Sequence, residues 1–371
     1  MKKIIKAISI ISVIFLICLV FKLNILDFSA FNIDEQKLIN YSGYYFSQLE
    51  QIEKEIYVKI DDAVKDIRET VWLGSVDTMN LSDKINRVIT AYFYDNPDKF
   101  YISNEYVIST SDLKFIRFST LKLSYIVNSK EQLDEKNKQL EQEIERIIAE
   151  NVTDEMTEFE KEVALHDALV KQVNYYKYEN INEIPGIKHT AYGALVQHEA
   201  VCDGYSKAFK LLLEKVGIEN IIIHGVSDNV AHAWNVVDIA GEYYHVDVTS
   251  DKINEPKKYA IHTYFNLSDE QISKTHNINE EFNTPKCNYS KYEYYNKKGY
   301  YISEQDSLYH KLKEIVTKQK KSSILEIKVD EKYTARNIID ILYELDFNNW
   351  YSDRQSNVEY TKVQDKYIFV K

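Results

Sequence analysis

Thr190–Ser250 reads TAYGALVQHEAVCDGYSKAFKLLLEKVGIENIIIHGVSDNVAHAWNVVDIAGEYYHVDVTS and holds the residues on which the interpretation of this chain rests. After Cys202 the apolar residues recur with the spacing of an α-helix, at Phe209, Leu212, Leu213 and Val216. Gly217 is a typical helix stop. The pattern therefore predicts Cys202 at or near a helix N-terminus. There the helix dipole and the free backbone N–H groups favour a thiolate over a thiol.

The next two segments are typical of a β-hairpin. Ala231–Asp238 and Glu242–Thr249 alternate apolar and polar residues, and Ala240-Gly241 lies between them as a turn. A two-residue loop pairs Ile239 with Glu242 and makes His232 and Asp247 diagonal neighbours on one face of the sheet. A three-residue loop places them on opposite faces, because a shift of one residue inverts the pattern.

Cys202, His232 and Asp247 are therefore predicted to form a nucleophilic site. Asp247 would orient the imidazole of His232, and His232 would take the proton of the Cys202 thiol. Taken singly, a lone cysteine is more often a small buried residue, and a lone histidine or aspartate more often has a structural role. The combination at a helix start and on one hairpin face favours catalysis.

Other residues compete for parts of this site. His198, His224 and His245 are alternatives to His232 as the base. Cys202, His232 and His245 are also the residue types that bind zinc, but no close ligand pair accompanies them. We expect no metal and no cofactor.

The sequence resembles the transglutaminase-like (transglutaminase core) superfamily at Gly193–Val196, Val201–Ser206, Gly217-Ile218, His232–Asn235 and Tyr244–Thr249. The resemblance covers about Glu158–His276. It implies a papain-like α+β fold, in which the helix that carries the cysteine packs on an antiparallel sheet that carries the histidine and the aspartate. It also makes Tyr192 and Trp234 candidates for the substrate groove or the oxyanion hole. The backbone N–H of Cys202 is the alternative oxyanion donor.

The first residues predict a membrane anchor. Lys2, Lys3 and Lys6 precede an apolar run that ends near Phe21, about long enough to span a bilayer. The lysines predict a cytoplasmic N-terminus and an extracellular remainder, in a single-pass cell-membrane protein of the bacterial envelope. The alternative is a signal peptide that is cleaved near Ser29-Ala30.

Composition excludes some functions. The 371 residues carry a formal net charge of −12 and no long basic cluster, so we expect no nucleic-acid partner. The three cysteines do not form a disulfide framework, and a Cys202–Cys287 bridge would block the nucleophile. Cys287 is predicted to lie in a loop without a role.

Four parts are predicted: a membrane anchor (1–22), an α+β module (32–151), the catalytic core (157–285) and a small α/β appendage (299–371). Residues 288–298 are predicted to be a linker or an edge segment. Predicted helices cover 32–68, 82–93 with Ser82 as N-cap, 129–151, 157–178, 307–318 and 334–345. Further predicted strands cover 105–109, 115–127, 323–329 and 367–370.

The expected function is thiol-dependent acyl transfer or hydrolysis on a protein or peptide amide outside the cell. Water would hydrolyse the acyl-enzyme, or an amine would intercept it as in protein crosslinking; the site residues are the same for both. The alternative is a non-catalytic, membrane-anchored scaffold that retains the fold as an interaction module.

Overall fold

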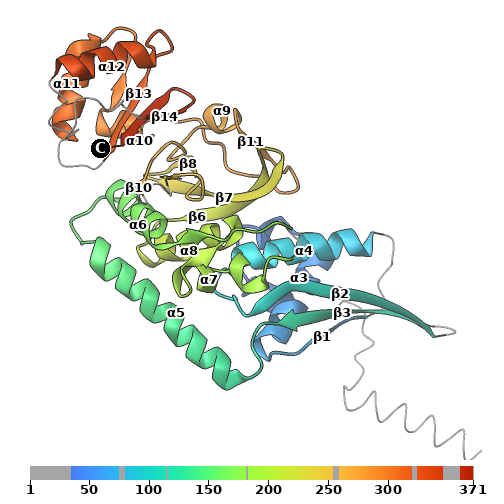
Figure 1. Ribbon diagram of the computed structural model, residues 1–371. Coiled ribbons are helices and arrows are strands. Elements are labelled where there is room, and N and C mark those ends of the chain that lie inside the picture. The colour runs from blue at the N-terminus through green and yellow to red at the C-terminus, as the bar shows by residue number, and fades with distance from the viewer. Residues whose placement is uncertain are drawn as a thin grey trace, which may run out of the picture. The chain divides into compact units, whose positions relative to one another are not determined.

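A computed structural model describes residues 35–74, 80–113, 116–180, 183–253, 259–319, 324–345 and 360–370 (Figure 1). The chain divides into two compact units, Met1–Gln132 and Leu133–Lys371. Among the described residues, no helix combines the length and the apolar character needed to cross a bilayer. The predicted anchor, residues 1–22, lies outside the described residues.

The first unit packs helices beside a three-stranded antiparallel sheet of order β1-β3-β2. Its elements are α2 (Glu35–Ile39), the 3-10 helix η1 (Phe46–Gln48), α3 (Gln51–Lys65), β1 (Thr70–Gly74), α4 (Leu81–Asp95), β2 (Ile102–Leu113) and β3 (Ile116–Tyr125). Leu121 and Leu123 of β3, two residues apart and so on one face of the strand, are buried. Both predicted strands are confirmed. Strand β1, which was not predicted, pairs with β3.

Two helix predictions in this unit are wrong in detail. The helix predicted over 32–68 is broken after Ile39, and α3 begins at Gln51. The Asp95 carboxylate accepts hydrogen bonds from the backbone N–H groups of Tyr45 and Phe46, at 3.0 and 2.8 Å, and so holds this segment in a turn. The N-cap of α4 is Asn80, in the left-handed conformation, and not Ser82.

The second unit contains a four-stranded antiparallel sheet of order β11-β6-β7-β8. Its first elements are α5 (Lys130–Asn151), which begins in the first unit, α6 (Glu158–Gln172), β4 (Asn174–Tyr175), η3 (Gly186–His189), α7 (Ala191–Leu195), β5 (Glu199–Ala200) and α8 (Cys202–Lys215). Then follow β6 (Asn220–Ser227), β7 (Val230–Ile239), β8 (Glu242–Val246), β9 (Lys252–Ile253), β10 (Tyr259–Ala260), α9 (Asp269–Ile272) and β11 (His276–Ile278). Helix α8 packs on β6 and β7 and buries Phe209, Leu212 and Leu213.

Helix α6 starts where the sequence predicts and ends earlier. Thr157 and Glu160 form a capping box at its N-terminus. The predicted end at Tyr178 is wrong, because Val173 is extended and β4 pairs with β5. The Tyr205 hydroxyl donates to the carbonyl of Val173 at 2.8 Å, which ties the end of α6 to α8.

The C-terminal part of this unit forms a second four-stranded sheet of order β12-β13-β15-β14. Its elements are α10 (Tyr294–Lys298), β12 (Tyr301–Ile302), α11 (Leu308–Lys318), β13 (Ile324–Val329), α12 (Ala335–Glu344), β14 (Tyr360–Val363) and β15 (Lys366–Val370). The predicted strands and helices are confirmed. Part of the segment 288–298, predicted as a linker or an edge, forms α10 and buries Tyr294 and Tyr295. The finer division into a core and an appendage stays a prediction.

Candidate active site

Cys202 is the first residue of helix α8. Val201 precedes it in an extended conformation, and Gly204 lets the first turn pack closely. A Cβ at Gly204 would lie 2.7 Å from the carbonyl oxygen of Lys188 and 2.9 Å from that of Thr190. The predicted helix start is therefore confirmed. The first amides of an α-helix have no partner within the helix, so they are available to a bound anion.

The hairpin has the predicted two-residue loop. Ile239 pairs with Glu242, while Ala240 and Gly241 both have positive φ, at 57° and 81°. This register brings Asp247, just beyond the end of β8, beside His232 of β7. Nε2 of His232 lies 2.9 Å from Oδ2 of Asp247.

His232 lies between a carboxylate and the cysteine sulfur. Burial alone would lower the pKa of His232, but the Asp247 carboxylate, and then the side chain of Cys202, raise it to about 10. Since Nε2 faces Asp247, Nδ1 is the ring nitrogen that remains for Cys202. The arrangement can therefore hold a proton on His232 beside a thiolate.

Four donors hold the Asp247 carboxylate. Oδ1 accepts from the backbone N–H groups of Thr249 and Ser250, at 3.0 and 3.3 Å. Oδ2 faces His232 and also His276, whose Nε2 lies 3.2 Å away. Burial would raise the pKa of Asp247, but His232 and His276 lower it far below its usual range. The carboxylate is therefore ionised and fixed in place.

His276 was not identified from the sequence. It lies on β11, which pairs with β6 and is separated from β7 by that strand. Gly225 of β6 lets β11 approach closely, because a Cβ there would lie 2.0 Å from the carbonyl oxygen of Asn277 and 3.0 Å from the Trp234 ring. No spacing rule links position 276 to Asp247, so only the order of the strands shows the contact.

Tyr175 is a second residue that sequence reasoning missed. It belongs to β4, and its ring stacks on Tyr205 with centroids 6.4 Å apart. Burial and then the charge of Cys202 raise the pKa of the Tyr175 hydroxyl. A phenol therefore lies within electrostatic reach of the cysteine.

The two side chains predicted for the substrate groove or the oxyanion hole donate to other groups. The indole N–H of Trp234 donates to Nδ1 of His245, at 3.2 Å. The Tyr192 hydroxyl donates to Oε1 of Gln139 at 2.5 Å and accepts from Lys136 at 3.4 Å. Both donors therefore have partners of their own within the protein.

The alternative bases also have other partners. His198 lies 3.0 Å from Nε2 of Gln172, and His224 lies 3.0 Å from Nδ2 of Asn279. Nε2 of His245 lies 2.9 Å from Asp269. In the described part of the chain, the histidine, cysteine and carboxylate groups close enough to share a metal do not include Cys202.

Cys202 and Cys287 are both free thiols. Cys202 is partly exposed, whereas Cys287 is fully buried and its backbone carbonyl accepts from the N–H of Asp269 at 2.7 Å. Burial raises the pKa of the Cys287 thiol. Cys287 thus lies outside helices and strands, as predicted, but is packed, and of the two cysteines in the described residues only Cys202 is accessible to a reagent.

The family model of the transglutaminase-like superfamily matches residues 145–248, which include Cys202, His232 and Asp247. This part of the chain is therefore a transglutaminase-like domain. It has the papain-like α+β arrangement, with the cysteine at the start of α8, the histidine on the sheet that α8 covers, and the aspartate just beyond the end of β8 in that sheet. No curated protein sequence matches the chain.

Two solved structures are similar to parts of the chain. One, described as a TGase, is 15% identical over 48% of this chain and 51% of its own, with a TM-score of 0.28. The other, a candidate cysteine protease from Cytophaga hutchinsonii, is 12% identical over 39% of this chain and 62% of its own, with a TM-score of 0.24. The chain thus spans less than two thirds of either protein. The fold assignment rests on the family match and the strand order.

Proposed function

We propose that the protein is a thiol-dependent enzyme that transfers or hydrolyses the acyl group of a protein or peptide amide. Cys202 is the nucleophile, His232 the acid and base, and Asp247 the group that orients His232. One observation carries the proposal: His232 contacts the Asp247 carboxylate through Nε2, at 2.9 Å, and the sulfur at the start of α8 is its other polar partner.

The reaction begins with a proton transfer from the Cys202 thiol to Nδ1 of His232. The thiolate attacks the amide carbonyl carbon, and backbone N–H groups at the start of α8 stabilise the oxyanion. The His232 imidazolium then gives its proton to the leaving amine as the C–N bond breaks. The product is a thioester on Cys202 and a free amine.

A second nucleophile completes the cycle. Water, deprotonated by His232, hydrolyses the thioester to a carboxylic acid and returns the proton to sulfur. An amine in place of water gives a new amide, as in protein crosslinking. We place this chemistry outside the cell, with the bulk of the chain held at the membrane by residues 1–22, so the substrates would be envelope proteins or wall peptides.

The first experiment is alkylation of the full chain with iodoacetamide between pH 5 and 9, with the modified residue mapped by mass spectrometry. We expect Cys202 to react well below pH 8.5, the usual pKa of a cysteine thiol, and His232→Ala to remove this reactivity. Glutathione, a thiol without an activating partner, is the reference for the alkylation rate. Cys287 is not used for this purpose because it is buried. The exposed His310 provides the matched control, His310→Ala.

The alternative function is a non-catalytic scaffold. It predicts that Cys202 reacts no faster than glutathione at any pH, and that Cys202→Ser preserves the cellular role. The buried, four-donor environment of Asp247 favours the enzyme, because a scaffold does not need an ionised carboxylate held against His232.

A further inference from the structure

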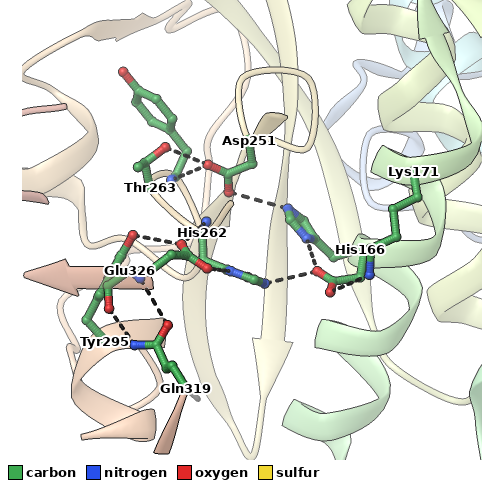
Figure 2. Close-up of polar contacts among 10 residues, drawn as sticks. His166, Lys171, Asp251, His262, Thr263, Tyr295, Gln319 and Glu326 are labelled. Atoms are coloured by element: carbon green, nitrogen blue, oxygen red, sulfur yellow. Dashed lines mark hydrogen bonds and ion pairs between the residues drawn. The ribbon is translucent and has the colours of Figure 1, made fainter. Parts of the chain in front are cut away.

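A second cluster of histidines and carboxylates shares no residue with the group Cys202, His232 and Asp247 (Figure 2). His166 and Asp167 belong to α6, His262 follows β10, and Glu326 belongs to β13 of the C-terminal sheet. The exposed fractions of the His166 and His262 side chains are 0% and 4%. The proposed acyl-transfer chemistry uses none of these residues.

Two imidazole nitrogens meet at one carboxylate oxygen. Nδ1 of His166 lies 3.3 Å from Oδ1 of Asp167, and Nε2 of His262 lies 3.0 Å from the same atom. All three ligand atoms lie within 4.8 Å of one another. Ligands about 2.0–2.1 Å from a tetrahedral zinc ion are about 3.3 Å apart. The cluster therefore has nearly the spacing of a bound metal's ligands.

The outer nitrogen of each ring faces a further carboxylate. Nδ1 of His262 lies 2.9 Å from Oε1 of Glu326, and Nε2 of His166 lies 3.3 Å from Oδ2 of Asp251 (Figure 2). The second pair is close but is not aligned as a hydrogen bond. In metal sites a carboxylate on the outer nitrogen fixes the orientation of the ring and its tautomer.

The Glu326 carboxylate and the His262 ring are themselves held in place. Oε2 of Glu326 accepts from the backbone N–H of His262 at 2.9 Å and from the Tyr295 hydroxyl at 3.0 Å. The His262 ring stacks on Tyr294, with centroids 3.6 Å apart and planes 3° from parallel. This support restricts the direction in which Nε2 of His262 points.

The cluster opens on a cavity of about 330 Å³, which Asp167, His262 and Glu326 help to line. The Asp167 side chain is 26% exposed, so the cavity gives an ion a route to its oxygens. The charged side chains that line the cavity are Asp167, Glu326, Lys171 and Lys318, and Asp251 and the buried Lys366 lie near them.

We propose that His166, Asp167 and His262 bind a divalent transition-metal ion of the zinc type, with the cavity side left for water or another ligand. Two imidazole nitrogens and one carboxylate oxygen suit such ions and not calcium or magnesium, which prefer all-oxygen ligands. Asp251 and Glu326 support the ligands. Because Glu326 belongs to β13, the ion would link the C-terminal sheet to α6.

The test is zinc binding by the full chain in detergent, after chelator treatment and with Cys202 alkylated to exclude binding by that thiol. We expect one Zn²⁺ per chain by equilibrium dialysis and elemental analysis, and a higher thermal midpoint with zinc. Asp167→Asn and His262→Gln should abolish the binding. Glu326→Gln, which keeps all three ligands, should weaken it about 10–100-fold.

Two controls separate this site from other histidines. His276→Gln alters another cluster of suitable groups, His232, Asp247 and His276, and His310→Gln removes an exposed imidazole. Neither should change the zinc content. Absence of zinc from the parent chain, which needs no variant to fold, would show a metal-free ion network and overturn the proposal. So would zinc that survives Asp167→Asn and is lost in His276→Gln.

Discussion

Nε2 of His276 lies 3.2 Å from Oδ2 of Asp247, the oxygen that also faces His232. Both histidine rings pack against Trp234, with centroid separations of 4.9 Å for His276 and 6.0 Å for His232. Because one carboxylate oxygen serves two imidazoles, the position of Asp247 depends on a strand outside the hairpin. The first prediction separates the two contacts.

Asp247→Asn should slow the alkylation of Cys202 at pH 7 by at least about tenfold, the effect of one unit of pKa. The substitution removes the charge that raises the pKa of His232, so fewer chains hold an imidazolium beside a thiolate. His276→Gln should slow it less, since the carboxylate charge stays. Rates measured by mass spectrometry for the parent, both variants and His310→Ala test this. An equal loss of alkylation rate in Asp247→Asn and His276→Gln would contradict it.

The stability of the second unit should depend on pH through the pair Asp247 and His232. The pKa of Asp247 is lowered, so its contribution is present above about pH 4, the ordinary range of an aspartate, and is lost as the pH falls further. The pKa of His232 is raised, so its contribution is complete below about pH 6.5 and is lost as the pH rises through about 10. Between about pH 4 and about pH 6.5, where both contributions are complete, Asp247→Asn should lower the free energy of unfolding by about 3 kcal/mol.

Urea unfolding of the parent and of Asp247→Asn from pH 3 to pH 10 measures this effect. The difference between their free energies of unfolding should be largest near pH 6 and should shrink toward both ends. A difference that does not vary with pH would mean that the asparagine acts through packing and not through charge.

Gly204→Ala should impair the site through the backbone. The new Cβ would meet the carbonyl oxygens of Lys188 and Thr190, so the start of α8 must shift. We expect a loss of about 1–3 kcal/mol in the free energy of unfolding, together with slower alkylation of Cys202.

Gly241→Ala is the matched control for this variant. Gly241 has φ of 81° and no neighbouring atom within 4 Å of the added Cβ, so the cost of about 1 kcal/mol is conformational. It should leave the alkylation rate of Cys202 nearly unchanged. A similar rate loss in both variants would show that general destabilisation, and not the helix start, controls reactivity.

Trp234→Phe tests whether the indole N–H serves the oxyanion. In the structure that N–H donates to His245, so its removal should leave a buried acceptor without this donor and cost about 1–3 kcal/mol. Cys202 alkylation should keep its pH profile. For any peptide amide found to be a substrate, a fall in kcat without a loss of stability would instead return the oxyanion role to Trp234.

Local patterns in the sequence predicted much of the domain. Apolar spacing after Cys202 and the stop at Gly217 predicted α8, since a helix is specified by residues within a few turns. The Ala240-Gly241 turn predicted the register that brings His232 to Asp247, because alternation and loop length fix which side chains share a face. The predicted strands and helices of the C-terminal part follow the same local rules.

The remaining features depend on contacts between distant segments. Asp95 interrupts the helix predicted over 32–68, and β11 brings His276 to Asp247 across 29 residues of chain. His262 meets Glu326 across 64 residues and Asp167 across 95. Local periodicity carries no signal for such pairs, because strand order and packing decide them. The sequence by itself therefore determined the helix start and the hairpin that carry Cys202, His232 and Asp247. Only the tertiary structure decided which further groups hold those residues, and which other histidines and carboxylates meet.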